Sequence, residues 1–169
     1  NDGWDMMIAF PPCTYLTVSG AMWYYHPDDK NLPYEKRRPH PKHPHRRKYQ
    51  TQALDFVKTL LDADIERIAL ENPVGVISTK IKKPTQIIQP YDFGHSTSKK
   101  TCLWLKGLPE LKATNIVDPE WVYLPNNTRM SKFHHETFSL PKEERSKIRS
   151  KTFSGVAKAM ANQWGRNVR

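Results

Sequence analysis

Two short apolar segments of this chain each stop at proline, and together they constrain the fold more than any other feature. Residues 4–10 (WDMMIAF) run into Pro11 and Pro12, and residues 67–73 (RIALENP) end at Pro73. Short, continuous apolar runs predict buried strands. Proline ends such a strand because it has no N–H for the hydrogen-bond ladder and its φ is fixed. The sequence therefore predicts two strands, each with a stiff exit.

Chemically reactive side chains stand at both exits. Cys13 follows Pro12 directly, and Glu71 and Asn72 come just before Pro73. If the two strands are parallel neighbours, their carboxyl ends lie at one edge of the sheet, which is where open α/β sheets bind ligands. We therefore expect the Cys13 thiol and the Glu71 carboxylate to face a common site.

The remaining pattern predicts an α/β fold with helices on both faces of the sheet. Further strands are expected over 85–93 and 101–105, and a short, irregular, polar insert over 107–141. Helical spacing of apolar residues predicts a helix over 50–62, whose buried face holds Ala53, Leu54, Val57, Leu60 and Leu61.

Two helices are expected to close the chain. One begins with Ser139 as its N-cap and has Pro141 near its first turn. The other spans residues 155–164, with Met160 and Trp164 expected in the core, and its apolar face holds Val156, Ala157, Met160, Ala161 and Trp164.

Length and composition predict a single domain over residues 1–169. A chain of 169 residues can enclose one hydrophobic core, and its 14 prolines imply many loops. Cys13 and Cys102 could form one disulfide, but nothing else suggests a secreted framework, so a reduced cytoplasmic setting is expected. Cys102 lies in an apolar strand and is expected to be structural. No membrane-spanning stretch or signal-peptide pattern is present, so no membrane partner is expected.

Charge indicates a polyanionic partner. The formal net charge is +10, and residues 36–48 (KRRPHPKHPHRRK) hold seven Lys or Arg, three His and three Pro without an acid. The prolines exclude a continuous helix, so we expect an extended loop that contacts DNA phosphates; a merely solvated loop is the plain alternative. The candidate contact residues are Arg37, Arg38, Arg46 and Arg47.

Two further groups in this region leave alternatives open. The aromatic run at 23–25 (WYY) either stacks on bases or packs in the core. His40, His43 and His45 lack a second ligand pair of recognisable zinc spacing, so no metal is expected.

A thiol and a carboxylate beside a basic surface suit a reaction on a nucleic-acid base. A thiolate is a strong nucleophile, and an acid opposite it can protonate the ring that it attacks. Attack on carbon 6 of cytosine, with ring nitrogen 3 protonated, turns carbon 5 into an enamine carbon that accepts an electrophilic methyl group. The base must be flipped out or single-stranded, because a stacked ring cannot be reached.

Four segments carry a resemblance to the DNA cytosine-5 methyltransferases. PPCT (11–14) resembles their Pro-Pro-Cys motif, and ENP (71–73) resembles their Glu-Asn-Val motif. FGHSTSKKT (93–101) is similar to their Phe-Gly-Val-Pro-Gln-x-Arg-x-Arg segment, and SKTFSGVAKAMANQWG (150–165) is similar to their last motif. Order and spacing agree over most of the chain. The resemblance is strongest to small phage- and prophage-encoded methyltransferase-like proteins.

The resemblance implies a Rossmann-like methyltransferase sheet and methyl transfer to carbon 5 of cytosine in DNA through a covalent cysteine adduct. It makes Cys13 the nucleophile and Glu71 the proton donor to the ring. Pro12, Asn72 and Lys99 become further substrate-binding candidates, with Asn72 ordering the Glu71 loop and Lys99 orienting the base or a phosphate.

The same resemblance implies S-adenosylmethionine as co-substrate and no metal. The residues expected near this methyl donor are Phe10, Pro11, Thr152, Phe153 and Gly155. The location implied is the cytoplasm of a bacterial host, with a phage-encoded origin.

The chain departs from the family pattern in three places. The glycine-rich donor loop and the acidic residue that holds the ribose precede the Pro-Pro-Cys strand in the family, and neither stands here. Thr101 replaces the second arginine of the basic motif, and the segment between Lys106 and Ser139 is too short for a target-recognition domain. Because the chain opens at Asn1 without methionine, we expect an N-terminal segment or a partner chain to supply the rest of the donor pocket.

Two other functions stay open. A degenerate methyltransferase could bind DNA without catalysis, which the missing parts favour. A related enzyme could instead add a different one-carbon group, such as hydroxymethyl, to carbon 5 of a pyrimidine.

Overall fold

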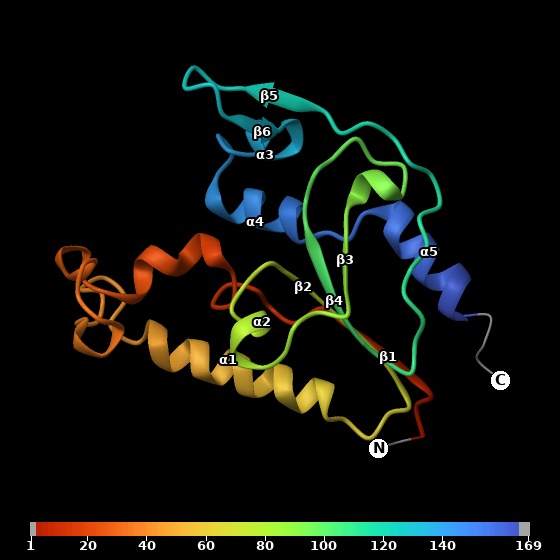
Figure 1. Cartoon of the computed structure of the whole chain (residues 1–169), viewed down its shortest axis with the longest axis horizontal. Coiled ribbons are helices and arrows are strands. Elements are labelled where there is room, and N and C mark those ends of the chain that lie inside the picture. The colour runs from red at the N-terminus through yellow and green to blue at the C-terminus, as the bar shows by residue number, and fades with distance from the viewer. Residues whose placement is uncertain (1–2, 166–169) are drawn as a thin grey trace. The chain divides into compact units, whose positions relative to one another are not determined.

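The computed structural model describes residues 3–165 and shows a mixed α/β fold (Figure 1). Its four-stranded sheet has the order β1-β2-β4-β3. The strands of this sheet are β1 (Met6–Ala9), β2 (Arg67–Pro73), β3 (Gln86–Ile88) and β4 (Thr101–Lys106). The predicted α/β class is therefore confirmed. No helix within the described range is both long and apolar enough to cross a membrane.

Contacts gather the described residues into two compact units. The first holds residues 3–86 and Cys102–Leu108, and the second holds Ile87–Thr101 and residues 109–165. The helices of the first unit are α1 (Arg46–Leu61) and α2 (Ile77–Lys80). The second unit contains β5 (Trp121–Tyr123), β6 (Arg129–Ser131), α3 (Lys132–Glu136), α4 (Lys142–Ser150) and α5 (Ser154–Trp164).

In the first unit, β1 and β2 are parallel neighbours, which is the condition that the sequence argument required. Met6 pairs with Arg67, and Ala9 pairs with Leu70. A parallel pair needs a crossover connection, and α1 supplies it between the two strands (Figure 1). Both proline-stopped exits therefore lie at the same edge of the sheet.

Helix α1 begins at Arg46 rather than at residue 50. Pro44 is the last proline of the basic segment, and the arginines and lysine after it are good helix formers, so nothing delays the helix further. Val57 is fully buried, and the predicted apolar face packs on the core through Ala53, Leu54, Leu60 and Leu61. The predicted face is confirmed.

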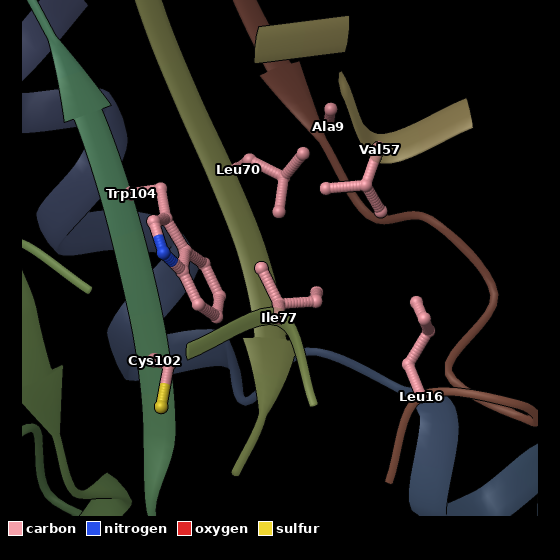
Figure 2. Close-up of a cluster of buried hydrophobic side chains, with 7 residues drawn as sticks. All are labelled: Ala9, Leu16, Val57, Leu70, Ile77, Cys102 and Trp104. Carbon is pink, nitrogen blue, oxygen red and sulfur yellow. The ribbon is translucent and has the colours of Figure 1, made fainter. Parts of the chain in front are cut away.

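One buried cluster holds the first unit together (Figure 2). Side chains of β1, β2, α1, α2, β4 and the loop after β1 meet in it, namely Ala9, Leu70, Val57, Ile77, Cys102, Trp104 and Leu16. The Leu70 and Val57 side chains face one another in Figure 2. The Trp104 indole donates its N–H to the Lys82 carbonyl oxygen at 2.8 Å, which satisfies its polar group. Cys102 is buried and forms no disulfide, so its structural role is confirmed.

The insert between β1 and α1 is divided by three short 3-10 helices, Val18–Tyr24, Pro27–Asp29 and Tyr34–Lys36. Residues 37–45 form the predicted loop, whereas residue 36 and residues 46–48 are helical. The buried Asp29 carboxylate accepts from the backbone N–H of Arg38 at 2.7 Å and from its guanidinium at 2.6 Å. These bonds from Arg38 lower the pKa of Asp29 to about 2. The basic segment is thus folded back rather than extended.

Helix α5 of the second unit confirms the last predicted helix. Met160 and Trp164 are buried as expected, and the Trp164 indole donates to the Pro109 carbonyl oxygen at 2.9 Å. Ala159, not Ala157 or Ala161, completes the buried face with Val156.

The segment 107–141 is more regular than predicted. Strands β5 and β6 form an antiparallel hairpin in which Trp121 pairs with Ser131, and α3 follows directly. At its turn, Asn127 adopts a φ of 59°, a left-handed conformation that asparagine tolerates. The Asn-Asn pair between two short runs was the available sequence signal.

Two further predicted boundaries are wrong. Pro141, not Ser139, is the N-cap of α4, because Pro141 has an extended ψ of 147° and its carbonyl oxygen accepts the first helical bond, from Arg145, at 2.8 Å. The strand expected over 85–93 ends at Ile88, because Pro90 starts a 3-10 helix, Pro90–Asp92.

Replacement of Gly75 by alanine should destabilise the first unit by about 1–3 kcal/mol. A Cβ at this position would overlap the Leu16 carbonyl oxygen, which is backbone and cannot move aside cheaply. Gly165→Ala is the matched control, because a Cβ there meets nothing within 4 Å. Urea unfolding of both variants checks this, and equal stabilities would contradict the tight approach.

Candidate active site

Asn72 joins the two strand exits. Its side chain is only 1% exposed and donates from Nδ2 to the Pro11 carbonyl oxygen at 2.9 Å. Loss of one partner of a buried hydrogen bond costs the desolvation energy of the other. The Pro-Pro-Cys exit of β1 is therefore held against the Glu-Asn-Pro exit of β2.

A second clamp lies one turn further along both loops. The Val76 N–H donates to the Leu16 carbonyl oxygen at 2.8 Å, and Thr17 and Gly75 form an antiparallel bridge. On the other side of the turn, the Cys13 carbonyl oxygen accepts from Leu16 at 2.9 Å and from Thr17 at 3.1 Å. The backbone that carries the Cys13 thiol is thus fixed at both ends.

Strand register decides the face on which Glu71 lies. Ala9 and Leu70 are paired and both point into the core cluster. Successive side chains of a strand point to opposite faces. Phe10 and Glu71 therefore lie on the other face, away from the core cluster; Phe10 is 49% exposed and Glu71 is half-buried.

The two thiols have different surroundings. Burial raises the pKa of Cys102, and the negative charge of Glu71 raises it further. Cys102 is consequently a protonated, sealed thiol at neutral pH. Cys13 is half-buried and follows the exposed Pro12, so it is the accessible thiol of the pair.

The other candidates, Lys99, Thr152, Phe153 and Gly155, belong to the second unit. Lys99 Nζ donates to the Arg149 carbonyl oxygen at 2.7 Å, near the end of α4, and lies 5.7 Å from the centre of the Phe153 ring. A cation is favourable at a helix C-terminus. Lys99 thus fastens α4 to the start of α5 within this unit. Thr152 is exposed.

Gly155 borders a groove of about 380 Å³ in the second unit. The groove is polar and is lined by the turn at 93–95, by Thr114 and Asn115, and by one face of α5 that includes Lys158 and Asn162. Phe153 and Thr152 do not line it. Its size lies within the range of small-molecule sites, roughly 300–1,000 Å³.

His95 is a positioning residue that the sequence analysis did not single out. Its Nε2 accepts the Gly155 N–H at 2.9 Å and so caps the first turn of α5. Gly155 has no room for a side chain, because the Phe93 carbonyl oxygen stands where its Cβ would be. The triplet FGH in the motif-like segment 93–101 was the signal that could have found it.

The four arginines predicted to contact DNA all make contacts inside the first unit. Arg38 pairs with Asp29, and the others donate to backbone carbonyl oxygens: Arg37 to Leu32 and Lys30, Arg46 to Thr14, and Arg47 to Tyr24 and Arg37. Arg46 and Arg47 also stack over tyrosine rings. Phosphate contact by these side chains stays a prediction.

Within residues 3–165, no three His, Cys, Asp or Glu side chains gather closely enough to hold a metal ion. The rings of His40 and His43 lie 5.3 Å apart, and both make edge contacts with Trp23. In the aromatic run, Tyr24 is buried and its hydroxyl donates to the Tyr15 carbonyl oxygen at 2.6 Å, whereas Trp23 is partly exposed. Core packing therefore holds for Tyr24, and stacking of Trp23 on bases stays a prediction.

Comparison with known protein families, curated proteins and solved structures gives no match to this chain. Only the residues and their geometry accordingly bear on the function of this chain.

The stability of the first unit should fall as pH drops through about 6.5. Burial lowers the pKa of His40, and neighbouring positive groups, led by His43, lower it further. The unfolded chain therefore binds a proton at this position more readily than the folded chain does. The contribution of neutral His40 to the free energy of unfolding is complete above the pKa of this histidine in the unfolded chain, and it is lost as the pH falls below that value.

His40→Asn tests this linkage. Asparagine retains an acceptor for the Lys42 N–H, which donates to His40 Nδ1 at 3.2 Å, but it does not titrate. Urea unfolding at about pH 7.5 and pH 5.5 should show a smaller acid loss than in the parent. The exposed His135→Asn is the control, and the same acid loss in both variants would refute the assignment.

Proposed function

We propose that this chain is the catalytic part of a DNA cytosine-5 methyltransferase, with Cys13 as the nucleophile and Glu71 as the proton donor. The observation that carries the proposal is the parallel pairing of β1 with β2, which brings the Pro-Pro-Cys and Glu-Asn-Pro exits to one edge, where Asn72 and Gly75 clamp them. A Rossmann-like sheet is part of the same proposal. DNA is the proposed substrate because of the +10 charge and the basic segment 36–48.

The proposed reaction uses the two exits as a pair. The Cys13 thiolate forms a bond to carbon 6 of an unstacked cytosine while the Glu71 carboxylic acid gives its proton to ring nitrogen 3. The electron pair displaced from the ring double bond makes carbon 5 nucleophilic. S-adenosylmethionine supplies the electrophilic methyl group. A base then takes the carbon-5 proton, the carbon–sulfur bond breaks, and ring nitrogen 3 returns its proton to Glu71.

The donor residues fit S-adenosylmethionine only in part. The groove beside Gly155 offers Lys158 and two asparagine side chains, which suit a carboxylate and hydroxyl groups. No acid stands among the described residues that line it, so the usual carboxylate partner of a ribose is lacking there. Phe10 and Pro11 belong to the first unit. We therefore propose that a further segment or a partner chain completes the donor pocket.

A second candidate, a methyltransferase-derived DNA-binding protein without catalysis, is favoured by one observation. Lys99 is the residue expected to orient the base or a phosphate, but its Nζ donates to the Arg149 carbonyl oxygen near the C-terminal end of α4. Addition of hydroxymethyl rather than methyl at carbon 5 is a third candidate, and mass spectrometry of the modified nucleoside separates it from methylation.

Cysteine attack on carbon 6 should make the protein exchange the carbon-5 hydrogen of cytosine with water, even without a methyl donor. Release of tritium from DNA that carries cytosine tritiated at carbon 5 measures this exchange. Cys13→Ala should abolish the release, and Glu71→Gln should lower its rate by about 10²–10⁴-fold. Cys102→Ala is the matched thiol control and should keep the activity.

The outcomes separate the candidates. Full release by Cys13→Ala would refute the nucleophile. Absence of release from the parent protein would favour the non-catalytic candidate. Calorimetric titration of the whole protein with S-adenosylmethionine is expected to show binding if the proposal holds, and the binding candidate predicts none.

A further inference from the structure

The insert between β1 and α1 contains a groove that the proposed reaction does not use. Its volume is about 700 Å³, the largest share of its lining is apolar or aromatic, and it lies wholly within the first unit. The side chains that matter for its chemistry are Met22, Trp23, Tyr25, Lys30, Arg37 and His40. Met22 and Trp23 are large apolar members that are exposed, at 69% and 37%.

The lining combines flat π surfaces with positive charge. Trp23 and Tyr25 supply aromatic rings, and Lys30 and Arg37 supply cations. None of the described residues that line the groove is an acid. Aromatic faces interleaved with cations are the recognition chemistry of single-stranded nucleic acid, where bases stack and phosphates pair with Lys or Arg. An acidic partner would leave the aromatic side chains without a contact, and a lipid-like apolar partner would leave the cations without one.

Two histidine rings hold Trp23 in place. The rings of His40 and His43 meet it edge-on, with centroids 5.1 Å and 5.3 Å from the indole. His40 is buried, and its Nδ1 accepts the Lys42 N–H. The indole therefore keeps its orientation without a ligand, and only its remaining surface is available for stacking.

The cationic wall is equally preorganised. The Arg37 guanidinium donates to the Leu32 and Lys30 carbonyl oxygens at 2.7 Å and 3.0 Å and lies over the Tyr25 ring at 4.7 Å. Arg47 in turn donates to the Arg37 carbonyl oxygen at 2.8 Å. A wall fixed in this way loses little conformational entropy when a ligand binds.

We propose that this groove binds an unpaired base of single-stranded DNA by stacking on Trp23, with Lys30 against an adjoining phosphate. A base within a duplex is already stacked on both faces and cannot enter a groove around a partly buried indole. The inference rests on the proposed function in its choice of DNA as partner. It adds that the protein prefers single strands to duplexes.

Fluorescence anisotropy of a labelled DNA strand of about 12 nucleotides, alone or as a duplex, tests the proposal. The whole chain is used with Cys13→Ala, so that binding is measured without chemistry. The single strand should bind more tightly than the duplex. Trp23→Ala should weaken single-strand binding by about fivefold or more, and Trp23→Phe should keep most of the affinity because it retains an aromatic face.

Two controls make the test specific. Trp4→Ala removes the other highly exposed tryptophan, 68% exposed, and should leave the affinity unchanged. Lys30→Ala should reduce the slope of log affinity against log salt by about 0.7, the loss of one phosphate contact on a single strand.

The proposal would be overturned if Trp23→Ala and Trp4→Ala changed the affinity for the single strand equally, or if single strand and duplex bound with equal affinity. The groove would then have to bind another class of partner. These results are independent of the tritium release, because the binding protein lacks the Cys13 thiol. Failure of that exchange would refute the reaction alone.

Discussion

The parallel pairing of β1 with β2 decides where every group of the candidate site in the first unit can stand. Because Ala9 lies opposite Leu70, both strands leave the sheet at one edge and the next residue of each points away from the core. A slip of one residue would turn the Glu71 side chain inward, where an unpaired carboxylate is costly. Such a slip would also remove apolar side chains from the buried cluster (Figure 2), so the cluster stabilises the observed register.

The two exits are held together by contacts of Asn72 and Gly75 with the backbone of the loop after β1. Asn72 bonds the Pro11 carbonyl, and the absence of a side chain at Gly75 lets the two loops touch. The rigidity of both exits thus comes at least from Asn72, Gly75 and the backbone around them. In the proposed reaction, this rigidity would preorganise Cys13 and Glu71.

The insert between β1 and α1 is folded although it contains most of the basic segment 36–48. Many cations close together repel one another, yet this segment is folded. Asp29 neutralises Arg38, and tyrosine faces receive the guanidiniums of Arg46 and Arg47. Arginine thus serves as the framework of the insert, and lysines such as Lys30 and Lys42 remain on its surface. Net charge predicts a polyanionic partner, but it cannot say which cations are committed to the fold.

Short-range patterns determined much of this protein: the proline-stopped strands, the apolar faces of α1 and α5, the sealed Cys102, and the positions of Cys13 and Glu71 near the ends of two strands. They failed where weak turn signals compete, as at the β5–β6 hairpin and Ser139, and they did not indicate that Arg38 pairs with Asp29. Local sequence specifies propensity and periodicity, which act over a few residues. Only tertiary structure decided that the two exits touch through Asn72 and Gly75, that His95 caps α5, and that Trp23 borders a groove. Such contacts join residues whose separation no local pattern encodes, and burial and hydrogen-bond geometry alone select them.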